Sequence, residues 1–252
     1  MYMLRKALVL CCCVGLLGAC APRPGEEESA NLVEKVAEDL PDQPADPSIV
    51  VAAPTMARSV FSNEWVGVAD VDLEPGELIP PHSAGVRYVY PQVECTLGIV
   101  AGDNEKEIAN LTPEELTTWP AGQLSIANEG ESAARFLVVE RNPIETAPDL
   151  ETLPAPDVAV DMERHGTLLL DDDNVLAAEI SLDQTEVNPL PPNLPLLVIA
   201  ISDCNLELTG PTVGDSESII EAGHAIWQPA GCESVSNVGD ARADFLVLGF
   251  RK

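Results

Sequence analysis

Basic and aromatic residues are scarce in this sequence of 252 residues. Lys and Arg number 13 against 42 Asp and Glu, which gives a formal net charge of −29. Because binding to phosphates requires clustered Lys and Arg, this balance excludes nucleic acid as a partner. Aromatic residues make up only 4% of the chain, whereas it contains 22 Pro and 17 Gly. That composition predicts many turns and short strands rather than long helices.

The apolar run nearest the N-terminus is too short to cross a membrane. Residues 7–16 are apolar and follow Arg5 and Lys6, whereas a spanning helix needs about 20 apolar residues. Small residues then lead to Cys20. This pattern resembles a bacterial lipoprotein signal, and the resemblance implies cleavage before Cys20 and acylation of Cys20 with fatty acids such as palmitate. An ordinary secretory signal with a chance cysteine is the alternative.

The residues that follow the predicted signal indicate a membrane-anchored protein whose folded part is held away from the lipid surface. Ala21 stands where an inner-membrane retention signal would have Asp, which favours the outer membrane, facing the periplasm, or the cell surface. Without residues 1–19 the side-chain charge is 11 − 42 = −31, which anionic lipid repels. Adaptation to a salty medium would explain the acidity equally well. Residues 20–58 are rich in Pro, Ala and Glu and predict a flexible linker.

The rest of the chain repeats itself. Pro-Ala-Gly at residues 120–122 recurs at 229–231, an offset of 229 − 120 = 109. At that offset, residues 64–140 contain 18 identities in 77 positions without a gap. We therefore expect two copies of one unit, residues 59–142 and 168–252, joined by a connector at 143–167.

Each copy is predicted to be all-β. Residues 66–73 alternate apolar with small or polar residues before a turn, and residues 175–182 do the same. Residues 135–139 and 244–248 are further strand candidates, each preceded by an Asn-x-Gly turn. Short strands at this spacing favour a sandwich or jelly roll.

The spacing of several residues in the first copy resembles the cupin family. The first cupin motif runs Gly, His, His, Glu, Gly, and the residues at the matching positions are Gly76, His82, Ala84, Tyr88 and Cys95. The Pro-Ala-Gly turn, followed by Ser125, is similar to the second motif, one residue short. The resemblance implies two tandem cupin-like jelly-roll β-barrels, that is, a bicupin.

The residues that hold a metal in cupins are mostly absent here. The family uses two His, one Glu and a further His, of which the first copy keeps His82 and the second keeps none. A catalytic transition metal takes about three protein ligands. His165 lies beside Arg164, which disfavours a nearby cation, and His224 belongs to the other copy. We therefore expect no metal and no cofactor.

The resemblance places any surviving ligand pocket inside the first barrel. His82, Arg87, Tyr88 and Ser125 lie at or beside the motif positions. Arg87 and Tyr88 favour a small polar or anionic ligand. For His82 itself, a partly exposed histidine without a ligand, in the loop after two prolines, is favoured over a ligand-contacting role.

Two acidic clusters are candidates for a calcium site or a catalytic carboxylate pair. Residues 171–173 are three successive Asp, but the spaced pattern and glycine of a calcium loop are missing, so an acidic turn is favoured. Glu114 and Glu115 follow Pro113 without a partner base, which favours a solvated turn over carboxylate chemistry. No nucleophile elbow or phosphate loop is present in the sequence.

Three cysteines remain beyond the signal: Cys95, Cys204 and Cys232. An exported protein meets an oxidising environment, in which these thiols allow one bridge. In cupins the last glycine of the first motif lies near the Pro-x-Gly turn. Cys204 takes that position and Cys232 follows the turn of the second copy, so the resemblance implies a Cys204–Cys232 disulfide. A Cys95–Cys204 bridge and a redox-active pair are the alternatives.

These features together predict a lipid-anchored envelope bicupin that is not an enzyme. We expect it to bind a small ligand or to serve as a structural or interaction module for a protein partner in the envelope. The alternative is a metal-dependent isomerase, lyase or dioxygenase that uses His82 with other ligands. A third reading is an assembly subunit whose acidic surface meets a basic partner.

Overall fold

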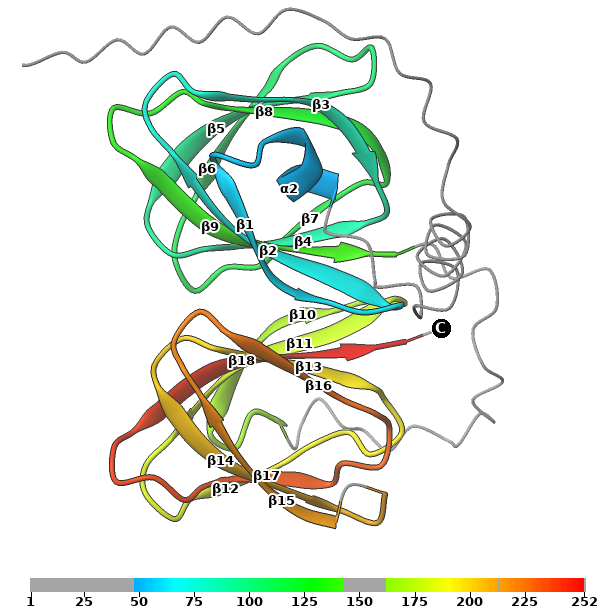
Figure 1. Ribbon diagram of the computed structural model, residues 1–252, viewed down its shortest axis with the longest axis vertical. Coiled ribbons are helices and arrows are strands. Elements are labelled where there is room, and N and C mark those ends of the chain that lie inside the picture. Colours follow the sequence, from blue (N-terminus) through cyan, green and yellow to red (C-terminus); the bar gives the residue numbers. More distant parts are fainter. Residues whose placement is uncertain (1–47, 143–161, 213, 252) are drawn as a thin grey trace, which may run out of the picture. The chain divides into compact units, whose positions relative to one another are not determined.

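The computed structural model describes residues 48–142, 162–212 and 214–251, and nearly all of its regular secondary structure is β-strand (Figure 1). The elements of the first copy, called repeat 1, are α2 (Ser48–Ala52), β1 (Ala57–Ser62), β2 (Val66–Leu73), β3 (Leu78–Ala84), β4 (Arg87–Pro91), β5 (Cys95–Ala101), β6 (Glu107–Leu111), β7 (Thr117–Trp119), β8 (Gly122–Asn128) and β9 (Ala134–Arg141). Those of repeat 2 are β10 (Gly166–Asp171), β11 (Val175–Leu182), β12 (Val187–Pro189), β13 (Leu196–Ala200), β14 (Cys204–Gly210), β15 (Gly214–Ile220), β16 (Ala225–Gln228), β17 (Ser234–Asn237) and β18 (Ala243–Phe250).

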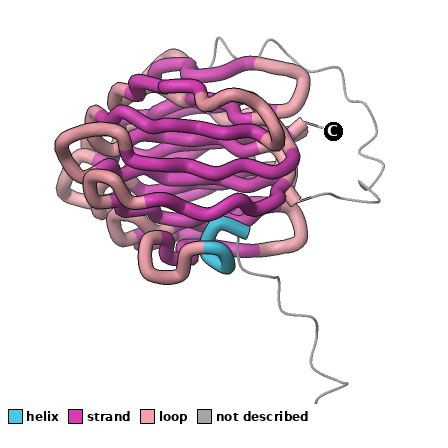
Figure 2. Tube along the Cα trace, turned by 90° about the horizontal axis from the view of Figure 1, so that it is seen from above, coloured by secondary structure: helices cyan, strands magenta, loops and turns pink. Residues whose placement is uncertain are grey.

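Each repeat consists of two antiparallel sheets. The strand orders are β1-β2-β9-β4-β7 and β3-β8-β5-β6 in repeat 1, and β10-β11-β18-β13-β16 and β12-β17-β14-β15 in repeat 2. Figure 2 shows the strands lying side by side in layers. This arrangement confirms the predicted all-β fold of two tandem jelly rolls. Hydrogen bonds between the described strands leave two separate sheets in each repeat, so neither closes into a single barrel.

The 109-residue offset holds in the strand pairing as well. β2 and β11 begin at residues 66 and 175, and β9 and β18 begin at 134 and 243. The first strand pair of each repeat has an irregularity at the same place, between Ser59 and Phe61 in repeat 1 and between Leu168 and Leu170 in repeat 2. The two repeats therefore share one backbone plan, and residues 109 apart can be compared directly.

Asn128 shows why some residues are identical in both repeats. Its Nδ2 donates to the carbonyls of Leu73 and Ser132, both at 2.8 Å, and its Oδ1 accepts from the amide of Gly130 at 2.9 Å. Asn237 makes the same three bonds at 2.9, 2.7 and 2.9 Å. Each side chain is buried and satisfies backbone groups at a turn that would otherwise lose hydrogen bonds.

The two repeats share a third core besides their own interiors. One cluster of apolar side chains fills repeat 1 and a second fills repeat 2. A third joins side chains of β2, β4 and β9 to side chains of β11, β13 and β18. β4 and β13 are buried at every position, because one face of each points into its own repeat and the other faces the neighbouring repeat. The described residues of both repeats belong to one compact unit.

The folded part begins earlier in the chain than the sequence indicated. Helix α2 lies within the range 20–58 assigned to the linker, yet Ile49 is fully buried in the core of repeat 1. Met162, within the predicted connector, is likewise buried in the core of repeat 2. The signal, Cys20, the linker up to residue 47 and connector residues 143–161 lie outside the described residues. Among described residues, no helix has the length and apolar character that crossing a membrane requires.

Candidate functional site

A buried cluster of charged side chains lies inside repeat 1. His82 comes from β3, Arg87 from β4 and Glu140 from β9, with 8%, 0% and 3% of their surfaces exposed. Glu140 Oε1 is 3.6 Å from Arg87 Nε and 4.0 Å from His82 Nε2. The structure thus brings together two of the predicted pocket residues, His82 and Arg87, and adds Glu140.

Arg87 ties several loops of repeat 1 together. Its Nη1 donates to the carbonyl of Pro120 at 3.1 Å, and its Nη2 donates to the carbonyls of Gly122 at 3.1 Å and His82 at 3.4 Å. The Pro-Ala-Gly turn is therefore held against β3 and β4 by one guanidinium group. Burial lowers the pKa of Arg87, but the neighbouring carboxylate of Glu140 opposes that shift, and an Arg side chain keeps its charge in proteins.

Helix α2 covers the cluster. The backbone amide of Ser48 donates to Glu140 Oε2 at 2.6 Å, and its hydroxyl donates to Glu140 Oε1 at 2.9 Å. Ile49, the next residue, is fully buried among the apolar side chains of repeat 1. Figure 1 shows α2 lying among the strands of repeat 1. The carboxylate of Glu140 is thus shared between Arg87 and the start of α2, and the cluster is closed from that side.

His82 is held in one tautomer by the backbone. Its Nδ1 lies 3.0 Å from the carbonyl oxygen of Pro80, which can only accept, so Nδ1 carries the hydrogen. Its Nε2 is buried and has no hydrogen-bond partner among the described residues. Burial is the largest cause of a lowered pKa at His82, and the charge of Arg87 adds to it, whereas the hydrogen bond to Pro80 and the charge of Glu140 oppose it without reversing it. His82 is therefore a neutral, buried histidine, and the expectation of a partly exposed residue is wrong.

The other two predicted pocket residues lie elsewhere. Arg87 and Tyr88 are neighbours on β4, so their side chains point to opposite faces of the sheet. Tyr88 joins the core between the repeats, where its ring meets that of Phe250 edge to face at 6.4 Å. Ser125 lies between Leu124 and Ile126, both in the core of repeat 1, and so takes the outer face of its sheet. The predicted four-residue pocket is not formed.

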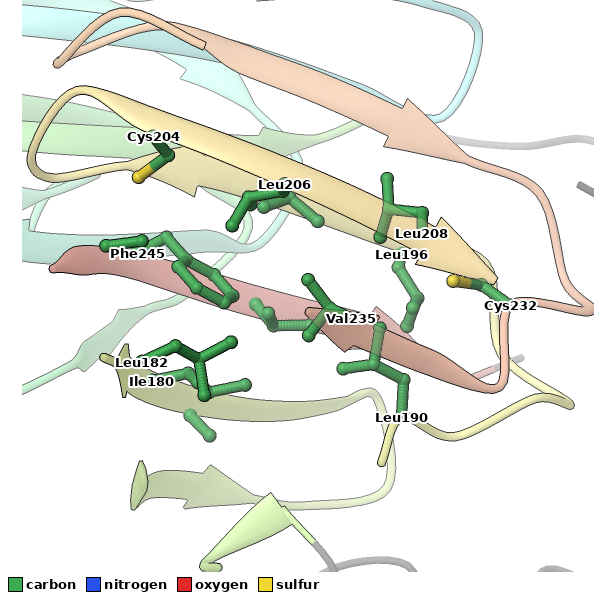
Figure 3. Close-up of a cluster of buried hydrophobic side chains, with 14 of the residues drawn as sticks. Ile180, Leu182, Leu190, Leu196, Cys204, Leu206, Leu208, Cys232, Val235 and Phe245 are labelled. Atoms are coloured by element: carbon green, nitrogen blue, oxygen red, sulfur yellow. The ribbon is translucent and has the colours of Figure 1, made fainter. Parts of the chain in front are cut away.

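The predicted Cys204–Cys232 disulfide is also absent. Cys95, Cys204 and Cys232 are free and buried. Figure 3 shows Cys204 and Cys232 at opposite ends of one apolar cluster, with Leu206 and Leu208 between them. Cys204 begins β14, whereas Cys232 lies against Gly210 at the end of β14. The length of β14, from Cys204 to Gly210, therefore separates them by roughly 20 Å, whereas a disulfide requires Cα atoms within about 7 Å. The alternative Cys95–Cys204 bridge is excluded too, because these residues belong to different cores.

The cluster does not fit the metal that the cupin fold implies. His82 and Glu140 are its only metal-binding side chains, and the described residues contain no group of three or more His, Cys, Asp or Glu placed to hold a metal ion. The guanidinium of Arg87 already supplies the positive charge beside Glu140. A metal centre with about three protein ligands therefore cannot form on these side chains.

The equivalent position in repeat 2 is apolar. Residues 109 positions after His82, Arg87 and Glu140 are Pro191, Leu196 and Gly249. A side chain at Gly249 would meet Leu194 at 2.9 Å and Leu196 at 3.3 Å. Leucine thus fills the space in repeat 2 that Glu140 fills in repeat 1. Only repeat 1 carries a polar interior at this position.

A second, open site lies between the repeats. It is a polar cleft of about 450 Å³, within the range of small-molecule sites. We call it the acidic cleft, and its lining residues are Glu114, Glu163, Arg164, His165, Gly166, Thr167, Glu179, Ser181 and Arg242. Glu114 comes from the loop between β6 and β7 of repeat 1, and the others come from repeat 2.

Glu179 is the most perturbed carboxylate of the acidic cleft. Tyr90 of repeat 1 donates its hydroxyl hydrogen to Glu179 Oε2 at 3.0 Å. Burial is the largest cause of a raised pKa at Glu179, and the negative charges of Glu114 and Asp244 add to it, whereas the hydrogen bond from Tyr90 and the charge of Arg242 oppose it. Burial and the charge of Glu179 also raise the pKa of Tyr90, so its hydroxyl stays protonated and keeps donating. The result is a half-buried carboxylate with acidic neighbours.

Sequence reasoning missed both Glu140 and the acidic cleft. A signal for Glu140 was present, because a charged residue in one copy against glycine in the other marks a position where the copies diverge. The sequence presents Glu114 and His165 as unrelated residues in different copies. They come together only because a loop of repeat 1 reaches repeat 2, which no spacing within one copy reveals.

No family model and no curated protein sequence matches this chain. Several solved structures match its fold. A serine-to-alanine variant of oxalate decarboxylase from Bacillus subtilis has a TM-score of 0.58 at 15% identity, over 77% of this chain and 72% of that chain. A tryptophan-to-tyrosine variant from the same organism has a TM-score of 0.57 at 15% identity, over 93% and 85%. Oxalate decarboxylase from Lactobacillus farciminis, in a formate complex, has a TM-score of 0.56 at 13% identity, over 75% and 78%. These similarities confirm the bicupin fold alone.

Proposed function

We propose that this chain is a lipid-anchored protein of the cell envelope, on the outer membrane, and that its two jelly rolls form a non-catalytic binding module. The signal-like N-terminus ending at Cys20 supports the anchor. The net charge of −29 supports a protein held off an anionic lipid surface by a linker.

The charge-balanced cluster in repeat 1 carries the non-catalytic part of this proposal. Glu140 and Arg87 neutralise each other, and both oxygens of Glu140 accept hydrogen bonds from Ser48. Repeat 2 has leucine side chains at the same place. Neither interior therefore offers the donors of a catalytic metal site, and in repeat 1 the polar groups connect loops, strands and α2.

The ligand of the module is more readily accommodated at the surface than in the interior. Reaching Glu140 would require α2 to leave, which would break two hydrogen bonds to a charged group and expose Ile49. The N–H groups on Nη1 and Nη2 of Arg87 already donate to three carbonyls, so Arg87 has little capacity for an anion. We therefore place small-ligand binding in the acidic cleft.

Metal analysis of the purified full chain tests the non-catalytic reading. The protein is extracted in non-ionic detergent without a His tag and examined by elemental analysis, with circular dichroism as a check of folding. We expect transition metal far below one atom per chain. One atom per chain that is lost in His82→Ala, but kept in the control His224→Ala at an exposed histidine, would overturn the proposal.

Labelling tests the anchor separately. Cells fed radioactive palmitate should label the wild-type chain, and Cys20→Ser should abolish the label and move the protein from the detergent phase to the aqueous phase. Labelling that persists in Cys20→Ser would show that Cys20 is not the attachment point.

A metal-dependent enzyme is the second candidate. It is favoured by the similarity to solved oxalate decarboxylases, one of which is described as having Mn(II) centres. His82 would be its remaining family ligand, yet the donors around it do not fit a metal. Incubation of the chain with Mn(II) and oxalate distinguishes the candidates, since only an enzyme of that type would consume oxalate above the protein-free rate and lose the activity in His82→Ala.

A further inference from the structure

We propose that the acidic cleft binds a small molecule that carries a guanidinium group, with Glu179 and Glu114 as the acidic partners of that group. The inference rests on the proposed binding function and adds the class of ligand. It is carried by a comparison of equivalent positions in the two repeats.

Repeat 1 contains an ion pair that repeat 2 lacks. Arg58 of β1 lies opposite Asp70 of β2 in the strand register, and Arg58 Nη2 is 3.1 Å from Asp70 Oδ2. The equivalent residues of repeat 2 are Thr167 and Glu179, which lie opposite each other in the same way. The acid is retained but its arginine is replaced by a neutral residue. Among the described residues Glu179 has no ion pair.

The acidic cleft lies where the missing arginine would be. Both Thr167 and Glu179 line it. Tyr90 orients the Glu179 carboxylate through Oε2 and is neutral, so it adds no positive charge. A guanidinium group supplied by a ligand would restore the interaction that Arg58 makes inside repeat 1. The fork of a guanidinium group matches a carboxylate with two hydrogen bonds.

Glu114, which repeat 1 contributes to the acidic cleft, provides a second observation. Its backbone has a φ of 66°, in the left-handed region that favours glycine. The equivalent residue in repeat 2 is Gly223, with a φ of 78°. The backbone conformation at this position favours glycine, yet repeat 1 has an acidic side chain at it despite the conformational cost. That side chain lines the acidic cleft and lies close enough to Glu179 to raise its pKa.

None of the basic groups that line the cleft forms an ion pair with Glu179 in the described structure. Arg242 is near enough for its charge to act on Glu179, but its ion pair is with Asp244 at 3.0 Å, and His165 lies 3.5 Å from Glu186. Arg164 has no ion pair among the described residues and can meet an anionic group on the same ligand. L-arginine, with a guanidinium and a carboxylate group, is therefore the probe, and a volume of about 450 Å³ can accommodate it.

The experiment compares L-arginine with L-citrulline, in which a neutral ureido group replaces the guanidinium group. Isothermal titration calorimetry of the full chain in non-ionic detergent at physiological salt should give one arginine site per chain. Citrulline should bind at least about tenfold more weakly, because the interaction with a charged donor is lost.

Variants separate this site from general attraction of cations by an acidic protein. Glu179→Gln removes the charge and should weaken arginine binding about tenfold or more. Thr167→Arg rebuilds the repeat 1 ion pair within repeat 2 and should abolish binding by filling the cleft. The matched control is Asp70→Asn, which removes the equivalent acid of repeat 1 and should leave binding unchanged.

Three results with arginine itself would overturn the proposal, and a fourth concerns calcium. These are no saturable arginine binding, equal binding of arginine and citrulline, or equal loss of binding in Asp70→Asn and Glu179→Gln. Displacement of arginine by calcium at equal concentration would reassign the cleft to an inorganic cation and overturn it as well. If Glu179→Gln fails to fold, Thr167→Arg decides the matter. None of these results changes the metal analysis, so failure of the cleft is distinguishable from failure of the proposed function.

Discussion

Removing the charge of Glu140 should strongly destabilise repeat 1. Glu140→Gln would leave the fully buried guanidinium of Arg87 without its counter-charge, since Glu140 is the acidic group within 4 Å of Arg87 in the described structure. Breaking a buried ion pair from one side costs about 3–5 kcal/mol. Arg87→Leu should cost a similar amount, because three backbone carbonyls lose their donor and the carboxylate of Glu140 loses its cation.

Repeat 2 indicates what the double substitution should do. It has leucine and glycine at the positions of Arg87 and Glu140, and its backbone follows the same plan. In Arg87→Leu/Glu140→Gln neither charge is left alone, so the loss of stability should be close to that of one single variant. The two single losses would then exceed the double loss by about 3 kcal/mol, at the upper end for residues in direct contact.

Urea unfolding followed by tryptophan fluorescence measures these differences, with Trp119 reporting from the core of repeat 1. Asp70→Asn is the control, because its pair with Arg58 is largely exposed and should contribute at most about 1 kcal/mol. Losses for Glu140→Gln as small as that of the control, or single losses that simply add in the double variant, would refute the assignment of a coupled buried pair.

Three further predictions concern other buried groups. His82 is neutral when folded and its pKa is lowered by burial, so unfolding takes up a proton and the free energy of unfolding should fall as pH drops below 6.5. In urea titrations at pH 7.5 and 5.5, His82→Gln should show a smaller pH dependence than wild type. Equal pH dependence in the two proteins would contradict this prediction. Ile49→Ala should cost about 2–5 kcal/mol of unfolding free energy, because Ile49 is fully buried in the core of repeat 1; a loss near zero would show that α2 does not pack there. A thiol reagent added in the absence of reductant should modify Cys95, Cys204 and Cys232 only after the chain is denatured. These residues are buried, and burial raises the pKa of Cys232 to about 11. A chain in which two of these thiols are oxidised would restore the disulfide hypothesis.

The fold class could be predicted from the sequence because both copies contain the same pattern of strand and turn residues. Identities 109 residues apart fall at positions with the same structural task, as Asn128 and Asn237 show with three matching hydrogen bonds each. Strand alternation and turn residues are local properties, so they can be read from neighbouring residues. His82 and Arg87 lie close together for a similarly local reason, because only residues 85–86 separate β3 from β4.

The tertiary structure decided what each strand face meets. Successive side chains of a strand point to opposite faces, so Arg87 and Tyr88 of β4 must point apart. Only the packing of one repeat on the other buries Tyr88 in a core shared by both. The length of β14 separates Cys204 from Cys232 although both follow motif positions. Glu140 and Ser48, 92 residues apart, and Glu114 and Glu179, in different repeats, meet because sheets bring distant segments together. Contacts of that kind depend on the whole three-dimensional arrangement, which the spacing of residues along one chain does not contain.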